Sequence, residues 1–218
     1  MNAFGSSVYL TSCAVTMLAV AGMLIADTRG AKSARGVLKA IAVAGFLGAS
    51  LSGGFPASAV RLITFVALVL CGLGDLLLIP SGAARVFVLG LVAFLLGHVG
   101  FFAAFLAEGV SFPVTSLALL AMAFPVFLAL RWLLPHVKPS MKLPVLLYIT
   151  VISLMVASAV GSVARGGSPL GLVAAIAFFL SDFSVARERF VRDTLINKLW
   201  GTPLYFGAQL VFAAWMVR

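Results

Sequence analysis

Apolar stretches follow one another along almost the whole chain, each with the roughly 20 residues needed to cross a bilayer. Within a stretch the apolar residues are continuous and do not alternate with polar ones, which argues against a transmembrane β-barrel. Hydrophobic residues make up 63% of the 218 residues and charged residues only 10%, so a soluble core could not bury the apolar surface. The sequence therefore predicts an all-α, polytopic membrane protein in which residues 1–218 form a single integral membrane domain.

Glycine and proline mark the joins between these stretches, as in Gly-Gly-Phe-Pro at residues 53–56 and Gly-Gly-Ser-Pro at residues 166–169. No Lys or Arg precedes the first stretch, so it lacks the basic segment of a signal peptide, and we expect it to be retained as a span. We expect eight transmembrane helices, at residues 7–26, 37–53, 60–79, 86–106, 112–133, 142–163, 169–186 and 199–217.

Basic residues are divided unequally between the two sides of this predicted topology. Loops one, three, five and seven carry eleven Lys and Arg residues, whereas the other side carries three. By the positive-inside rule the odd-numbered loops are cytoplasmic and both termini lie outside. Topology thus explains the net charge of +9, and we expect the bilayer of a bacterial inner membrane, and no nucleic acid, as the partner. The eleven are Arg29, Lys32, Arg35, Arg85, Arg131, Lys138, Lys142, Arg187, Arg189, Arg192 and Lys198; the three are Arg61, Arg165 and Arg218.

Two carboxylates lie inside apolar spans, Asp75 in the third and Asp182 in the seventh. Both spans run inwards, and each acid is about four residues, or roughly 6 Å, before the cytoplasmic end of its helix. We therefore expect both carboxylates at similar depth, in one pocket open to the cytoplasmic side. The other acids lie in loops or at their edges, where a solvated surface position accounts for them: Asp27, Glu108, Glu188 and Asp193.

A buried pair of acids has the properties that general acid–base catalysis near neutral pH requires. A charged aspartate inside a bilayer is costly, so such residues usually face a polar cavity. Removal from water favours the protonated form of a carboxyl group, and a second carboxylate nearby favours it further in one of the two. Such a pair holds one proton donor and one acceptor. The alternatives are a structural hydrogen bond between helices and a proton relay in a proton-coupled transporter of small molecules or lipids.

His98 and Lys39 are the other titratable side chains that the prediction places inside spans. His98 lies about 12 residues into the fourth span, roughly 18 Å from the cytoplasmic end and so deeper than the acids. It is either a substrate-contacting group or a hydrogen-bonded core histidine, and Gly97 and Gly100 beside it leave room for a neighbour or a ligand. Lys39 either extends to the cytoplasmic surface or holds a phosphate at the same face as the acids.

Further polar side chains are candidates for the wall of the same cavity. Tyr148 and Tyr205 either contact substrate or pack at the membrane interface. Gln209 is costly to leave unpaired in lipid, so it either lines the cavity or bonds to another helix. Ser181 directly precedes an acid, where a small residue permits close approach of helices. The predicted substrate-binding residues are Lys39, His98, Tyr148, Ser181, Tyr205 and Gln209.

A weak internal repeat relates the two halves of the chain. His98 lies 23 residues after Asp75, as Tyr205 lies 23 residues after Asp182. A lysine also stands near the start of the span before each acid-bearing span. The repeat suggests two four-helix halves in parallel orientation.

Several signatures of other enzyme classes are missing from the sequence. It contains no G-x-S-x-G, no H-E-x-x-H and no phosphate-binding glycine loop. Its only histidines are His98 and His136, which argues against a multi-histidine zinc site, and we expect neither a metal nor another cofactor. Cys13 and Cys71 fall inside predicted spans without metal-ligand spacing, and we expect both to be packing residues.

Short motifs, in their order and spacing, resemble those of the YhhN-like lysoplasmalogenase family of integral membrane proteins, and the resemblance covers nearly the whole chain. Lys39 and Tyr148 also fall where the family often has a Lys and a Tyr. Ala40 departs from the proline that often follows that lysine, which weakens the assignment of a family role to Lys39. The motifs are GDLLL at 74–78, FLLGH at 94–98, AFFLSDFSVA at 177–186, RF at 189–190 and PLYFGAQ at 203–209.

The resemblance implies eight spans and hydrolysis of the vinyl ether bond of lysoplasmalogens or a related lysolipid. The products would be a fatty aldehyde and glycerophosphoethanolamine or glycerophosphocholine. One protonated aspartate would protonate the β-carbon, and its ionised partner would stabilise the oxocarbenium ion and orient water, as carboxylate pairs do in glycosidases. Asp75 and Asp182 are the implied catalytic pair, with neither role assigned to either. The implied partner is a lysophospholipid, and the sequence leaves its headgroup and the oligomeric state open.

Overall fold

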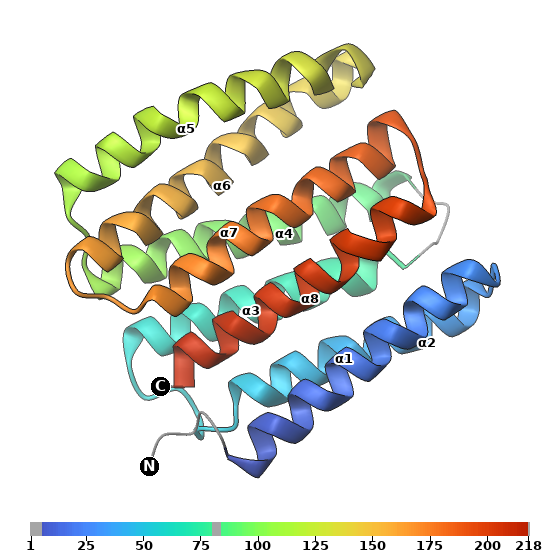
Figure 1. Cartoon of the computed structure of the whole chain (residues 1–218), viewed down its shortest axis with the longest axis horizontal. Coiled ribbons are helices and arrows are strands. Elements are labelled where there is room, and N and C mark those ends of the chain that lie inside the picture. Colours follow the sequence, from blue (N-terminus) through green and yellow to red (C-terminus); the bar gives the residue numbers. More distant parts are fainter. Residues whose placement is uncertain (1–5, 80–83, 218) are drawn as a thin grey trace.

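The computed structural model describes residues 6–79 and 84–217, and within these residues the chain is helical, without a strand (Figure 1). This confirms the predicted all-α class. The helices are α1 (Ser7–Thr28), α2 (Lys32–Ser50), α3 (Ala59–Leu77), α4 (Ala84–Glu108), α5 (Phe112–Leu133), α6 (Pro139–Ala164), α7 (Pro169–Ala186) and α8 (Leu195–Val217), with a 3₁₀ turn η1 (Leu134–His136) and a π-helical turn η2 (Arg187–Val191).

Local sequence explains where the helices begin and end. The side chains of Ser6, Ser58 and Ser168 each accept a hydrogen bond from a backbone N–H of the following first turn, which satisfies a donor that has no partner within the helix. Gly54 and Gly166 adopt φ angles of 86° and 95°, a conformation that favours glycine. The glycine-rich joins expected from the sequence are therefore the turns between helices.

Six of the described helices are long and apolar enough to cross a membrane: α1, α3, α4, α5 and α6, and α7 together with η2. The other two carry more polar groups, since α2 contains Lys32, Arg35 and Lys39 and α8 contains Asn197 and Gln209. Several of these polar side chains point into the bundle, so the two helices contribute polarity to its interior. An integral membrane protein is thus supported, and the count of eight spans stays a prediction.

Consecutive helices pack as pairs: α1 with α2, α3 with α4, α5 with α6 and α7 with α8. Figure 1 shows the α1–α2 pair at one edge of the bundle and the α5–α6 pair at the opposite edge, with α3, α4, α7 and α8 between them. The last helix, α8, packs against α1, α2, α3 and α7. Side chains on α8 are therefore able to meet residues from the first half of the chain.

Aromatic stacking and close helix approach fill the interior. Phe101 of α4 stacks on Phe212 of α8 with ring centroids 3.8 Å apart. Gly97 and Gly100 bring α4 against α3: a Cβ added to Gly97 would stand 2.6 Å from the sulfur of Cys71. The space that Gly97 and Gly100 leave beside His98 is therefore occupied by α3 and not by a ligand. Cys71 is buried and free.

Two helix boundaries differ from the expected spans in ways that matter for the site. Helix α2 begins at Lys32 and not near residue 37, which places Lys39 two turns inside the helix. Helical backbone continues from α7 through η2 to Val191, so residues 187–191, expected in a loop, are π-helical. Residues 172–200 contain neither glycine nor proline, so no residue in this stretch forces the helix to end at Ala186. Asp182 consequently lies farther from the end of its helix than expected.

Candidate active site

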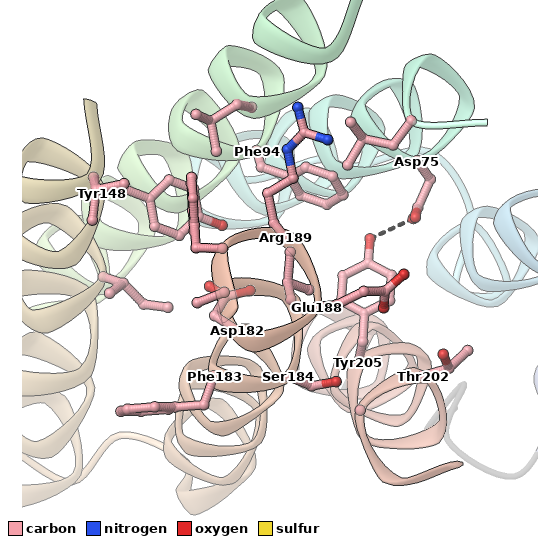
Figure 2. Close-up of a pocket in the computed structure, with 18 of the residues that line it drawn as sticks. Asp75, Phe94, Tyr148, Asp182, Phe183, Ser184, Glu188, Arg189, Thr202 and Tyr205 are labelled. Atoms are coloured by element: carbon pink, nitrogen blue, oxygen red, sulfur yellow. Dashed lines mark hydrogen bonds between the residues drawn. The ribbon is translucent and has the colours of Figure 1, made fainter. Parts of the chain in front are cut away.

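A cavity of about 740 Å³ reaches into the bundle from the end that carries the odd-numbered loops. Arg35, Arg189 and Asp193 line it at that end, and Asp75 and Asp182 line it farther in. Figure 2 shows the two acids on different walls of the cavity, one from α3 and the other from α7. The shared pocket expected for the acids is present in the structure, whereas their catalytic roles stay predictions.

Asp75 is surrounded by donors. It lies two residues before the end of α3 and is 2% exposed. Its Oδ1 is 2.9 Å from the ammonium of Lys39, and its Oδ2 accepts a hydrogen bond of 2.5 Å from the hydroxyl of Tyr205. Gly74 beside it leaves space for the ring of Phe94, since a Cβ there would stand 2.7 Å from that ring. A cation and a hydroxyl donor thus each contact one oxygen of this carboxyl group.

Lys39 does not extend to the cytoplasmic surface, which corrects one of the two alternatives raised by the sequence. Its residue exposure is 8%, and its ammonium lies in the cavity wall against Asp75. The reason is the early start of α2, which moves Lys39 inward along the helix axis. Its charge is matched by Asp75, so a phosphate would have to compete with a buried carboxylate for it.

Asp182 has neutral or weakly basic neighbours. Its side chain is 18% exposed, and its Oδ2 lies 3.5 Å from Nε2 of His98. The hydroxyl of Tyr148 points into the space beside it (Figure 2). In the described part of the chain no lysine or arginine forms an ion pair with Asp182. The two acids therefore share a cavity but differ in charge environment.

His98 lies behind Asp182 and is absent from the cavity wall. Its ring is fully buried, and Nδ1 is 2.7 Å from the carbonyl oxygen of Phe94. A carbonyl only accepts, so Nδ1 carries the hydrogen and Nε2 faces the carboxyl of Asp182. The ring packs on Phe178 with centroids 4.3 Å apart. The structure thus favours the core-histidine alternative, and it corrects the expectation that His98 lies deeper than this acid.

The remaining candidates divide between the wall and the interior. Tyr148 and Tyr205 line the cavity. Ser181 does not, because its hydroxyl donates 2.7 Å to the carbonyl of Phe178 in the preceding turn. Gln209 is fully buried one turn beyond Tyr205 and also lies outside the cavity wall. Ser181 and Gln209 therefore lie outside the wall of this cavity, and their contact with a ligand stays a prediction.

The four residues related by the internal repeat meet in a crossed arrangement. Asp75 of the first half bonds to Tyr205 of the second, and Asp182 of the second half faces His98 of the first. Each acid thus has one of its partners in the opposite half of the chain, in addition to a partner in its own half.

Four acids expected on a solvated surface have specific partners or line the cavity. Asp27 pairs with Arg35 at 2.8 Å. Glu188 and Asp193 line the cavity mouth. Glu108, at the other end of the bundle, accepts hydrogen bonds from Ser162 of α6 and Trp215 of α8.

Sequence reasoning also missed Arg35, Arg189 and Thr202 as residues that line the cavity. For Glu188 and Arg189 the available signal was the long stretch after Asp182 without a helix breaker.

Comparisons with known proteins agree with the motifs. The model of the YhhN family matches residues 34–216. Two curated relatives, each named lysoplasmalogenase and found in Mycobacterium bovis and Mycobacterium tuberculosis, are 32% identical over 154 residues. The matched part is 68% of this chain and 58% of each relative, so the chain spans little more than half the length of these proteins. No solved structure matches this chain significantly.

Proposed function

The chain belongs to the YhhN family, and on that premise we propose that it is a membrane hydrolase that cleaves the vinyl ether bond of lysoplasmalogens or a closely related lysolipid. The two aspartates of the cavity, Asp75 and Asp182, are the catalytic groups in this proposal. The observation that carries it is the difference between their surroundings. A vinyl ether needs a proton on its β-carbon and an anion beside the cation that forms, and two carboxyl groups of unlike environment supply both.

Asp182 is the proton donor in this proposal. No lysine or arginine of the described residues pairs with it, and apolar rings such as Phe178 pack around its neighbour His98. Such surroundings disfavour a bare negative charge. The proton on the carboxyl group of Asp182 moves to the β-carbon of the vinyl ether, and the α-carbon bonded to the ether oxygen becomes an oxocarbenium ion.

Asp75 is the anion that stabilises this cation. Lys39 and Tyr205 each engage one of its oxygens, and a carboxylate keeps further lone pairs for a water molecule. The oriented water adds to the α-carbon, and the proton that it loses returns to Asp182. The hemiacetal then collapses to a fatty aldehyde and the glycerophospho alcohol, with one water consumed. The substrate chain would occupy the apolar part of the cavity between α4, α5 and α6.

The test is release of aldehyde from a lysoplasmalogen by purified protein in detergent or vesicles. We expect Asp75→Asn and Asp182→Asn each to lower turnover by at least about a hundredfold, the range of general acid–base catalysis. Asp27→Asn is the matched control, because it removes a carboxylate that lies outside the cavity wall. Thermal unfolding of all three variants shows whether they remain folded.

Two results would count against the proposal. If Asp182→Asn keeps most of the turnover, the acid role is wrong. If the wild-type protein releases no aldehyde but moves protons across vesicles together with a solute, the two acids serve transport.

We also propose eight spans with both termini outside. In support, α1 begins and α8 ends at the same end of the bundle (Figure 1), as an even number of crossings requires. The basic odd-numbered loops and the cavity mouth share the opposite end, which the positive-inside rule assigns to the cytoplasm. Labelling of single cysteines introduced into the loops tests this orientation.

A further inference from the structure

Arg189 is a cation of the cavity mouth whose hydrogen-bond donors are not engaged by any side chain among residues 6–79 and 84–217. It lies on η2, lines the cavity and is exposed. Its guanidinium carbon stands 3.8 Å from the ring centroid of Phe87, which also lines the cavity (Figure 2 labels Arg189). In the described part of the chain no carboxylate pairs with it and no side-chain hydrogen bond uses its nitrogens.

Among the described residues, two other cations line the cavity, and each forms an ion pair with an acid. Lys39 is paired with Asp75 at 2.9 Å. Arg35 is paired with Asp27 at 2.8 Å. An anionic ligand would therefore have to break an existing ion pair to use either of them. Arg189 is the lining cation that needs no such exchange among the described residues.

Stacking on Phe87 prepares Arg189 for an oxyanion. The guanidinium carbon lies over the face of the Phe87 ring, and this cation–π contact uses none of the N–H groups in a hydrogen bond with an oxygen. These donors form a fork that matches two oxygens of a phosphate group. Because the stacked side chain is already held in place, less rotamer freedom is lost when a ligand binds.

The position of Arg189 also fits the distance between the reacting bond and the phosphate of a lysolipid. Arg189 follows Asp182 by seven residues in continuous helical backbone, roughly 10 Å along the axis. The glycerol unit between a vinyl ether and a phosphate bridges a similar length. A lipid held at Arg189 by its phosphate would thus present its ether bond at the level of the acids.

We propose that Arg189, stacked on Phe87, is the phosphate anchor of this cavity and sets its preference for phosphate-bearing lysolipids. The inference rests on the proposed function for the identity of the lipid. Glu188 and Asp193 also line the mouth, and Glu188 lies 3.8 Å from Lys198. These carboxylates repel a second negative charge, so a phosphodiester with an ammonium group suits the mouth better than a phosphomonoester.

The experiment compares two vinyl ether substrates, one with a phosphocholine headgroup and its 1-alkenylglycerol counterpart without phosphate. For Arg189→Gln we expect KM for the phosphocholine substrate to rise about tenfold to a hundredfold, because a charge-assisted hydrogen bond to the phosphate is lost. We expect kcat to change little. KM for the phosphate-free substrate should stay as in wild type. Arg189→Lys keeps the charge but loses the fork, and an intermediate KM is expected. Arg192→Gln is the matched control, because Arg192 is an exposed arginine at the end of η2 that does not line the cavity.

Three outcomes would overturn the inference. One is an equal rise of KM for both substrates, and another is an equal effect of Arg192→Gln. If the wild-type protein cleaves neither substrate, the proposed function fails. The role of Arg189 is then tested by measuring the affinity for a lysophosphocholine with a saturated ether chain. Unchanged affinity in Arg189→Gln then refutes the anchor, whereas weakened affinity, with inorganic phosphate competing poorly, supports a lipid phosphate site.

Discussion

The ion pair between Lys39 and Asp75 yields a quantitative prediction about stability and activity. The two charges are 2.9 Å apart, so at an effective dielectric constant of about 20 they attract each other by about 6 kcal/mol. Removing one partner of a buried pair leaves the other charge uncompensated and typically costs about 3–5 kcal/mol. In Lys39→Met the hydroxyl of Tyr205 still donates to Asp75, so we expect the lower end, about 3 kcal/mol.

Thermal unfolding of the purified variants in detergent measures this loss. For a chain of this length a loss of about 3 kcal/mol lowers Tm by roughly 6–12 °C. Lys32→Met is the matched control, since Lys32 is an exposed lysine of the same helix. We also expect Lys39→Met to reduce aldehyde release, because Asp75 loses the cation that fixes its carboxylate.

A double-mutant cycle separates the pair from its surroundings. Lys39→Met, Asp75→Asn and the double variant should show a coupling energy of at least about 2 kcal/mol, with the double variant more stable than Lys39→Met alone. Additive effects, or a Tm of Lys39→Met equal to that of Lys32→Met, would refute the claim that Lys39 compensates a buried carboxylate.

Two further predictions concern Tyr205 and Gly97. Tyr205→Phe keeps the ring but removes the donor to Asp75, and the loss of a hydrogen bond to a charged group, about 1.5–3 kcal/mol, should lower aldehyde release roughly tenfold or more; turnover equal to wild type would contradict this. Gly97→Ala places a methyl group 2.6 Å from the sulfur of Cys71 and should cost about 1–3 kcal/mol in thermal unfolding. Cys71→Ala in the same chain should recover most of that loss, and a double variant as unstable as Gly97→Ala would argue against the clash.

The helices and the common cavity could be predicted because each depends on a local property of the sequence. An apolar stretch of bilayer length becomes a helix, and an acid inside such a stretch has to face a polar interior. Asp75 and Asp182 were therefore identified without knowledge of the packing. The same reasoning could not identify their partners. Packing across the bundle decides which helices are neighbours, and the spacing of residues along one helix does not predict this arrangement.

Local spacing did not indicate which acid His98 and Tyr205 would contact. The repeat places each of them 23 residues after the acid of its own half, yet each contacts the acid of the other half. Ser181 and Gln209 illustrate a second limit. Both are polar groups in apolar helices, and the sequence does not distinguish a side chain that faces a cavity from one that faces a neighbouring helix. Arg189 was missed because residues 187–191 were expected in a loop, although the stretch after Asp182 contains no glycine or proline that would end the helix.

The crossed contacts of the two acids have a consequence for biogenesis. Helices enter the membrane in the order of synthesis, so Asp75 and Lys39 arrive before Tyr205, which lies on α8. Until α8 is in place, the carboxylate of Asp75 lacks its hydroxyl donor and the wall that this helix contributes. The cavity wall and the donor set of Asp75 are thus complete only after α8 has been inserted, and the hydrolysis proposed above requires that step.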